Sequence, residues 1–231
     1  MIARNDRAVA RSTSSQETPT LMKLFTSKLA PNPRRVAIFL AEKNIDVPIV
    51  EIDLAKSENL DADFVAKNPL GRVPVLELDD GTFLAESMAI CRYFEEIQPE
   101  PPLLGTDARD KALVEMWNRR MEFEIMGNVT GCFRHSHPYW EGRIEQVADY
   151  GDLCRRNIED RMAWLDGELA GHDYIAGDRF TVADMTAVSA FDLGKIAKIR
   201  IPEDLKNLTR WYQRVSERPS VASTSPTRKR D

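Results

Sequence analysis

A proline at the beginning of an apolar run constrains the fold more than any other feature of the sequence. Pro74 lies in the segment Asn-Pro-Leu-Gly-Arg-Val-Pro-Val-Leu (68–76), and the residues after it have the pattern of a strand. Because proline has no backbone N–H, it cannot donate a hydrogen bond to a neighbouring strand. We therefore expect Pro74 at an edge or a turn. The Asp-Asp-Gly sequence at 79–81 predicts a hairpin between strands at 72–78 and 82–85.

The elements around this hairpin follow an α/β order. Residues 21–26 have the pattern of a strand, and a helix start is predicted with Asn32 as N-cap and Pro33 at the first helical position. This helix is expected to reach about Lys43, a second strand to cover 47–54, and a polar connection to end at residue 67. A further helix is expected from Ser87 to Ile97. The order of these elements is typical of a compact thioredoxin-like domain.

Beyond this unit the pattern becomes helical. The connection at 98–106 contains three prolines and a glycine, which end the preceding helix and stiffen the chain. We predict an α/β thioredoxin-like N-terminal domain followed by an all-α helical C-terminal domain. Helices are expected at 107–127, 144–169, 181–198 and 205–215. The expected boundaries are a disordered extension at 1–20, the first domain at 21–98, a linker at 99–106, the helical domain at 107–220 and a disordered tail at 221–231.

Charge, hydropathy and cysteine content disfavour several classes of function. The net charge of −5 gives no general attraction to nucleic acid or acidic membranes, and no apolar run approaches the roughly 20 residues of a membrane helix. The three cysteines form no CxxC pair, which argues against a disulfide scaffold and against zinc and fits a reducing, cytoplasmic setting. His135 and His137 do not share a helix face, so a metal pair is not expected there. The first twenty residues lack the apolar core of a secretory signal, and Met22 is a candidate functional start.

Glu86 and Ser87 stand where the hairpin ends and the next helix begins. A helix N-terminus offers free amides and a partial positive charge, which suit a carboxylate. Ser87 adds a hydroxyl and Glu86 adds an anion suited to an ammonium group, so the pair matches an α-amino acid moiety. In a purely structural alternative, Ser87 caps the helix and Glu86 interacts with its dipole.

The 68–76 segment resembles the Asn-Pro-x-Gly-x-Val-Pro segment of cytosolic glutathione transferases. The acidic-Ser pair Glu86-Ser87 and the later capping box Thr181-Val182-Ala183-Asp184 also resemble that family, and the similarity covers about residues 22–219. It implies that Pro74 is cis, that the Val73 amide and carbonyl pair with the cysteinyl unit of glutathione, and that Glu86 and Ser87 hold the γ-glutamyl end. It also implies glutathione as co-substrate, no metal, and a homodimer. In that homodimer the hairpin-and-helix end of one subunit meets the second domain of the other.

The group that activates the glutathione thiol has two candidates. A free thiol has a pKa of about 8.5, so a transferase must stabilise the thiolate. The position where Ser- and Cys-type members carry their donor holds Ala30. Asn32 can donate its side-chain amide from the helix start while its carbonyl oxygen caps the helix, and Ser27 lies at the strand end. The Ala30-Pro31-Asn32 segment resembles the Thr-Pro-Asn of bacterial nu-type members, which favours Asn32.

Cations are the expected partners of the glycine end of glutathione. Lys56, just after the second strand, is the first candidate, and Arg35 and Lys43 are further ones.

The electrophile is expected to bind between the two domains. Arg120 and Glu124, on the first helix of the second half, are the candidate pocket residues, because an arginine facing the linker side would need an anionic partner. Met116 and Phe123 are interpreted as core. The aromatic and histidine residues at 135–140 are expected in an irregular stretch and could line an apolar pocket.

The favoured function is that of a glutathione transferase, which activates the thiol of glutathione for attack on a small electrophile. One alternative is a glutathione-dependent disulfide reductase, which would use two glutathiones because no cysteine lies in the loop after the first strand. A second alternative is a non-catalytic glutathione-binding protein, which Ala30 keeps open. A protein that ignores glutathione altogether is the third. Partners other than glutathione, an electrophile or disulfide, and a second copy of the chain are not expected.

Overall fold

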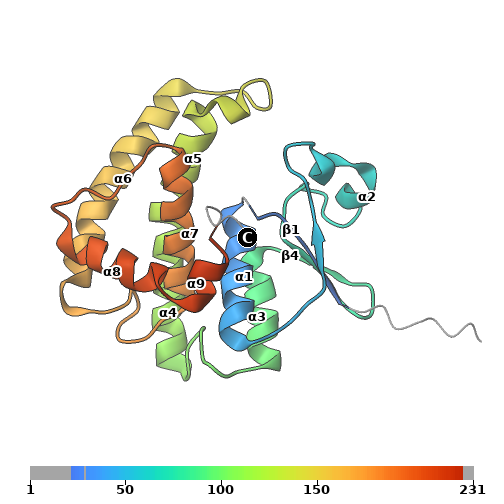
Figure 1. Ribbon diagram of the computed structural model, residues 1–231, viewed down its shortest axis with the longest axis horizontal. Coiled ribbons are helices and arrows are strands. Elements are labelled where there is room, and N and C mark those ends of the chain that lie inside the picture. The colour runs from blue at the N-terminus through green and yellow to red at the C-terminus, as the bar shows by residue number, and fades with distance from the viewer. Residues whose placement is uncertain (1–21, 29, 226–231) are drawn as a thin grey trace, which may run out of the picture.

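The computed structural model describes residues 22–28 and 30–225. The expected extension at 1–20 and the last six residues of the expected tail lie outside these ranges. Figure 1 shows a sheet on one side of the molecule, a group of helices on the other, and the helices α1 and α3 between them. The predicted fold class, a thioredoxin-like unit followed by an all-helical unit, is confirmed.

The sheet of the first unit has four strands in the order β2-β1-β3-β4. β1 is parallel to β2 and antiparallel to β3, and β3 forms the predicted hairpin with β4. The strands are shorter than predicted, because pairing covers only part of each apolar run. Their bounds are Lys23–Thr26 for β1, Ile49–Glu51 for β2, Val75–Glu77 for β3 and Phe83–Ala85 for β4.

Side chains of β1 and β3 alternate between two apolar clusters. Leu24 and Leu76 point into the main core, which includes apolar side chains of α1 (Pro31–Lys43) and α3 (Ser87–Ile97). Phe25 and Val75 point to the other face, where they pack with Phe64. Phe64 belongs to the short helix α2 (Ala62–Val65), which follows a turn of 3-10 helix at Glu58–Leu60. The sheet is therefore covered on both faces.

The start of α1 differs from the prediction. The N-cap is Ala30 and the helix begins at Pro31, so the expectation that Asn32 caps the helix is wrong. Two prolines compete for the first helical position, and Pro31 takes it because its fixed φ suits that position and it has no N–H to leave unpaired. Asn32 consequently lies inside the first turn.

In the second unit, every regular element among the described residues is a helix, but the helix boundaries differ from the predicted ones. The first predicted helix does not end near Gly127: it continues through a π-helical segment into α5, which contains His135. Leu113, Met116 and Phe123 are exposed, so the expectation that Met116 and Phe123 belong to the core is wrong. The α-helices are α4 (Ala108–Arg120), α5 (Gly127–Ser136), α6 (Ala148–Glu168), α7 (Val182–Ile196), α8 (Lys206–Ser216) and α9 (Pro219–Ser223), with the π-helical segment η2 (Met121–Met126) and 3-10 turns at Pro138–Trp140 and Leu169–Gly171.

α7 forms the centre of this unit, and almost all of its side chains are buried. The predicted capping box at its start is present: the Asp184 carboxylate accepts hydrogen bonds from the backbone N–H of Thr181 at 2.9 Å and from the Thr181 hydroxyl. Asp184 also accepts from the backbone N–H of Ile175 and from Trp211 Nε1. Among the described residues, no helix is both long enough and apolar enough to cross a bilayer.

Lys43 anchors the connection between the two units. Its buried ammonium group pairs with Glu95 at 2.8 Å and donates to the carbonyl oxygens of Gln98 and Pro101 at 2.6 and 2.8 Å. The expectation that Lys43 contacts the glycine end of glutathione is therefore wrong. Its charge satisfies the carbonyls of a proline-rich connection that cannot form a helix.

Candidate functional site

The strand pairing brings several sequence-predicted residues to one edge of the sheet. Val75 pairs with Phe25 of β1 and with Ala85 of β4. Because β3 is antiparallel to both, the end of β1, the start of β3 and the end of β4 lie together. Ser27 follows β1, Val73 precedes β3 and Glu86 follows β4. The parallel strand β2 ends at the same edge, which we call the site edge.

Val73 offers an unpaired backbone at the site edge. The Val73–Pro74 peptide bond is cis, as the resemblance implies. Within residues 22–28 and 30–225, no hydrogen bond forms to the amide or carbonyl of Val73. Backbone groups without a protein partner are rare in folded proteins, so the amide and the carbonyl of Val73 are a free donor and a free acceptor for an extended ligand.

Asn68 shapes the loop that presents Val73. Its side-chain amide donates to the carbonyl oxygen of Arg72 at 2.8 Å, and its oxygen accepts from the N–H of Leu70 at 3.2 Å. Gly71 has φ +58°, and a Cβ there would lie 3.0 Å from the carbonyl oxygen of Asn59. Asn68 belongs to the sequence motif, but the motif alone assigns it no role. A polar residue that begins an Asn-Pro turn is the signal that could have identified it.

Glu86 has a strained backbone. Its φ and ψ are 67° and 117°, a combination that only glycine adopts readily. Such conformations cost about 1–3 kcal/mol and concentrate at functional sites. Its side chain is exposed and has no hydrogen-bond or ion-pair partner among the described residues. The strain holds a free carboxylate between β4 and α3.

Ser87 begins α3 directly after this strained residue. The N-cap of the helix is Glu86 and not Ser87, so the alternative in which Ser87 caps the helix is wrong. No side chain caps the helix, and no acidic side chain lies in its first turn. Its first amides and its positive dipole end are consequently free for an anion.

Arg35 lies behind Ser87 rather than in front of it. Its side chain is only 2% exposed. Arg35 Nη1 donates to Ser87 Oγ at 3.0 Å and to Glu122 Oε1 at 2.7 Å. The expectation that Arg35 meets the glycine end of a ligand is therefore wrong, because its guanidinium is buried between α3 and the second unit.

The start of α1 has one free backbone donor. Pro31 and Pro33 have no N–H, and the N–H of Arg34 donates to the carbonyl oxygen of Ala30 at 3.2 Å. The N–H of Asn32 has no partner within the described residues, and its side chain is exposed and unbonded there. Ser27 is buried and its hydroxyl also has no partner in that part of the chain. Ala30 packs on the apolar cluster to which Val73 belongs, so the start of α1 lies beside this cluster.

Lys56 lies in the loop that follows β2. Its ammonium group is exposed and pairs with Asp53 at 3.1 Å. The hydrogen bond to Lys56 is the main reason that the pKa of Asp53 lies below its usual value, and the same bond raises the pKa of Lys56. Lys56 is therefore a charged surface group beside the site edge and remains available to a carboxylate.

An aromatic segment of the second unit reaches the same loop. The Tyr139 hydroxyl donates to the carbonyl oxygen of Leu54 at 3.2 Å, and Arg143 donates to that of Ala55 at 3.2 Å. Tyr139 stacks with Phe133, and the Arg143 guanidinium lies 4.6 Å from the Tyr139 ring centre. The aromatic stretch that the sequence singled out thus lies next to the loop of Lys56.

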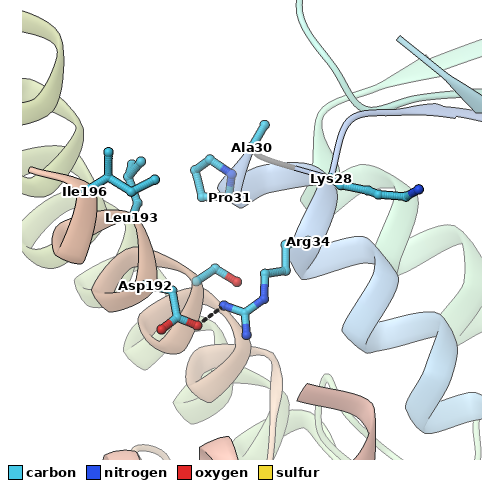
Figure 2. A pocket seen from close by; sticks show the side chains of 8 residues that line it. Lys28, Ala30, Pro31, Arg34, Asp192, Leu193 and Ile196 are labelled. Carbon is cyan, nitrogen blue, oxygen red and sulfur yellow. Dashed lines mark hydrogen bonds and ion pairs between the residues drawn. The ribbon is translucent and has the colours of Figure 1, made fainter. Parts of the chain in front are cut away.

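A small cavity separates the start of α1 from α7, as Figure 2 shows. Its volume is about 10 Å³, which is close to the minimum for one water molecule. At its base, Arg34 forms an ion pair with Asp192 of α7. Burial raises the pKa of Asp192, but Arg34 and further donors more than offset this and hold it below the usual value. The cavity is lined by Lys28, Ala30, Pro31, Arg34, Ser189, Asp192, Leu193 and Ile196.

Arg120 and Glu124 lie in a different cavity, of about 310 Å³, whose other lining residues are Arg161, Trp164 and Glu168 of α6. All of these residues belong to the second unit. Glu124 pairs with Arg161 at 2.6 Å, and the Arg120 guanidinium stacks on Trp117. Glu122, between them in sequence, faces α1 instead, and residues two apart point to opposite sides of a helix. The structure therefore does not bring Arg120 and Glu124 to the site edge.

The cysteines of the chain are not part of the site. Cys91, Cys132 and Cys154 are free and buried. Burial raises the pKa of Cys91 to about 12, so it stays a thiol at neutral pH. Within the described ranges, no group of three or more His, Cys, Asp and Glu side chains could hold a metal ion.

The chain matches known proteins over most of its length. Residues 30–97 match the N-terminal domain of glutathione S-transferases, and residues 124–219 match their C-terminal domain. Glutathione S-transferase 2 of Saccharomyces cerevisiae is 38% identical over 87% of this chain and 88% of its own length. Glutathione S-transferase GstA of Escherichia coli is 31% identical over 80% and 88%. The crystal structure of Gtt2 from Saccharomyces cerevisiae has a TM-score of 0.83 and 37% identity, covering 87% of this chain and 99% of that one.

Proposed function

The chain belongs to the glutathione S-transferase family, and we propose that it binds glutathione along the site edge and activates the thiol for attack on a small electrophile. One observation carries the proposal. An unpaired backbone at Val73, a strained free carboxylate at Glu86 and an uncapped helix start at Ser87 converge on the strand residue Val75. Their chemistry matches three consecutive parts of one peptide-like ligand.

Each part of glutathione has a partner at this edge. The cysteinyl amide and carbonyl pair with the backbone of Val73 beside Pro74. The α-carboxylate of the γ-glutamyl end binds the first amides of α3 and the hydroxyl of Ser87. The ammonium group of the same end pairs with Glu86. Lys56, on the loop after β2, takes the glycine carboxylate.

We propose that Asn32 stabilises the thiolate. Its backbone N–H is the free donor of the first turn of α1, and its side-chain amide adds a second donor. The positive end of the helix dipole acts at the same place. Ser27 is the alternative donor, because its hydroxyl is unbonded within the described residues and lies at the end of β1. Ala30 has no polar side chain with which to take this role.

Thiolate absorbance of bound glutathione near neutral pH tests this assignment. We expect a thiolate signal in the parent protein, a loss of most of it in Asn32→Ala and little change in Ser27→Ala. The backbone N–H survives in Asn32→Ala, so a residual signal is consistent with the proposal. A full signal in that variant would overturn the role of the Asn32 side chain. A parent protein that binds glutathione without any thiolate would favour the non-catalytic alternative.

Binding itself is tested by thermal unfolding with millimolar glutathione. A ligand that binds only the folded state must raise the melting temperature. No shift in the parent protein would overturn the proposed function.

A paired assay separates transferase from disulfide reductase. The described cysteines are all buried, so a reductase mechanism needs a second glutathione as the thiol partner. We expect turnover of an aryl halide with glutathione. Turnover of a small disulfide alone, under the same conditions, would favour the reductase.

We also propose that the protein works as a homodimer in the cytoplasm. Free cysteines suit a reducing compartment. Exposed apolar side chains lie both on the hairpin and α3 side, at Phe83 and Ile97, and on the second unit, at Leu113, Met116 and Phe123. These two surfaces correspond to the two sides of the expected subunit contact, and burying them would remove apolar area from water.

A further inference from the structure

The loop after β2 is folded around the side chain of Asp53. Its carboxylate accepts hydrogen bonds from the backbone N–H groups of Ala55 and Lys56 at 2.9 and 3.3 Å, and it pairs with the Lys56 ammonium group at 3.1 Å. We call residues 53–57 the Lys56 loop. These contacts use donors of the loop itself, so its carbonyl groups can accept hydrogen bonds from other parts of the chain.

The second unit supplies donors to two successive carbonyl groups of the Lys56 loop. The Tyr139 hydroxyl donates to the carbonyl oxygen of Leu54 at 3.2 Å, and Arg143 Nη2 donates to that of Ala55 at 3.2 Å. Both side chains lie in the connection between α5 and α6, at 138–143, which we call the clasp. In Figure 1 this connection lies at the top of the second unit and extends toward the side where α2 lies. The clasp therefore binds the first unit at a place separate from the packing of α1 against α7.

Contacts within the second unit give the clasp its shape. The Tyr139 ring stacks on Phe133, and the Arg143 guanidinium lies 4.6 Å from the centre of the same ring. The backbone N–H of Tyr139 donates to His137 Nδ1 at 3.1 Å, and Gln146 Nε2 donates to the carbonyl oxygen of His137 at 3.1 Å. The two donors of the clasp are thus already ordered, so binding the Lys56 loop costs them little further conformational entropy.

Lys56 directly follows the two residues whose carbonyl groups the clasp binds. Its side chain is 75% exposed, and an ion pair between exposed flexible groups contributes little, because holding both groups in one geometry costs entropy. A charged group binds a carboxylate better when its backbone is already held in the bound position. The clasp supplies this restraint from the second unit.

We propose that Tyr139 and Arg143 are positioning residues for the glycine carboxylate of glutathione: they hold the Lys56 loop at the site edge, and recognition of that carboxylate depends on the second unit. The inference rests on the proposed function, because it takes Lys56 as the partner of the glycine end. Tyr139 and Arg143 act through the backbone of the Lys56 loop and do not touch the ligand.

A ligand that lacks only the glycine charge tests this inference. The probe is glutathione amide, in which a carboxamide replaces the glycine carboxylate, and its affinity is compared with that of glutathione by titration calorimetry. The parent protein should bind glutathione at least about threefold more tightly. Lys56→Met should lose most of this preference. The Tyr139→Phe/Arg143→Met double variant should lose a similar share, with an unchanged affinity for the amide.

Arg134→Met is the matched control. The Arg134 guanidinium lies 4.7 Å from the centre of the Trp140 ring, much as Arg143 lies over Tyr139. Among the described residues, however, its side chain donates no hydrogen bond to the first unit. We expect an unchanged preference for glutathione over the amide. If the double variant does not fold, Tyr139→Phe alone replaces it, because this change removes one hydroxyl and keeps the stacked ring.

Amide hydrogen exchange measures the restraint without a ligand. The backbone N–H groups at 55–57 should exchange at least about threefold faster in the double variant than in the parent protein, because two hydrogen bonds to their loop are lost. Amides of α7 serve as the reference and should keep their rates. Unchanged exchange at 55–57 would show that the clasp does not hold the Lys56 loop and would overturn the inference.

The outcomes distinguish this inference from the proposed function. Failure of the parent protein to bind glutathione would overturn both. If Lys56→Met removes the preference for glutathione but the double variant keeps it, the inference is overturned and the proposed function stands. The same holds if the double variant binds both ligands more weakly by one factor, because the glycine end would then not be the part affected. A parent protein that binds the two ligands equally would overturn the inference and the role of Lys56 but not glutathione binding.

Discussion

The backbone of Glu86 indicates a functional role, because its conformation is energetically unfavourable. A φ of 67° is unfavourable for any residue with a side chain, and the Glu86 side chain has no hydrogen-bond or ion-pair partner among the described residues, although its carbonyl oxygen accepts from the N–H of Ile90. The conformation holds an exposed carboxylate beside the free amides of α3. A strained backbone that places an unpaired carboxylate beside free amides is the observation that points to a ligand.

Replacing Glu86 with glycine should separate the two effects. We expect Glu86→Gly to raise the free energy of unfolding by about 1 kcal/mol, because glycine adopts this conformation without strain. Glutathione affinity should fall, because the partner of its ammonium group is gone. Urea unfolding and titration calorimetry measure the two quantities.

Asn44→Gly is the control for this prediction. Asn44 has φ 52° and follows α1 at the end opposite to the one that lies at the site edge. Its replacement should also stabilise the fold but leave glutathione affinity unchanged. A destabilised Glu86→Gly variant would contradict the view that the backbone there is strained.

At the scale of the element, helix N-termini differ in whether side chains cap their first backbone amides. We call capped N-termini closed and those without a side-chain cap open. α7 is closed by the Thr181–Asp184 capping box, in which a buried carboxylate accepts from Thr181, Ile175 and Trp211. α1 and α3 are open, with no side-chain cap and no acid in the first turn. Closed starts stabilise the fold, and open starts leave amides for a ligand.

Asp184 should make the stability of the protein depend on pH. Burial raises its pKa to about 6, although hydrogen bonds from Ile175, Trp211 and Thr181 act in the opposite direction. The folded state therefore holds the proton more tightly than the unfolded chain. The contribution of Asp184 to stability is complete below about pH 4 and is lost as the pH rises through about 6.

Asp184→Asn removes this titration. Its amide group would also face donors, so we expect a loss of at least about 2 kcal/mol. The difference in unfolding free energy between parent and variant, from urea unfolding at pH 4 to 7, should be larger at pH 4. A difference that grows toward pH 7 would show that the carboxylate is favoured in its charged form.

The sequence predicts elements better than it predicts their junctions. Apolar periodicity located the hairpin, α1, α3 and α7, because burial on one face determines them. The prediction that Asn32 is the N-cap was wrong because which of the two prolines begins α1 depends on the loop before them. The prediction that a helix ends near Gly127 was wrong because α5 packs against α6, and this packing keeps the glycine within the helical run.

The same limit applies to the candidate site. Val73, Glu86 and Ser87 are near one another because of strand pairing, and the sequence order of strands is enough to predict that. Arg35 and Glu122 are 87 positions apart and meet only through the packing of the two units. No local pattern marks such a pair. Their roles could therefore not be predicted from the sequence.

At the scale of the molecule, buried ion pairs join the two units. Arg34 pairs with Asp192 of α7, and Glu42 accepts hydrogen bonds from Arg218 and Ser220 at the C-terminal end of the described chain. In Figure 1, α1 lies beside α7 and α9, where these contacts form. α1, the first helix of the thioredoxin-like unit, thus packs against helices of the second unit as well as against α3 of its own.

Removing Arg34 should destabilise both units together. We expect Arg34→Met to lower the free energy of unfolding by about 2 kcal/mol, because Asp192 loses its charged partner on α1 and keeps only Lys195 and Tyr212. The transition should stay single. All four tryptophans lie in the second unit and report on it by fluorescence, while labelling of the buried Cys91 reports on the first. Different midpoints for these two probes would show that the units unfold separately.

The proposed homodimer predicts which surface charge disrupts assembly. Phe123 is 67% exposed on η2, and Met116 and Leu113 lie about two and three turns before it on α4. Exposed apolar side chains in such a row are unfavourable in water unless a partner covers them. We expect the parent protein to sediment at twice the mass of the chain and Phe123→Lys to sediment as a folded monomer. Ile49→Lys is the control, because Ile49 is 64% exposed but lies on β2, the opposite edge of the sheet from β4. That variant should remain a dimer. A monomeric parent protein would contradict the homodimer, and a dimer that survives Phe123→Lys but dissociates in Ile49→Lys would place the subunit contact elsewhere.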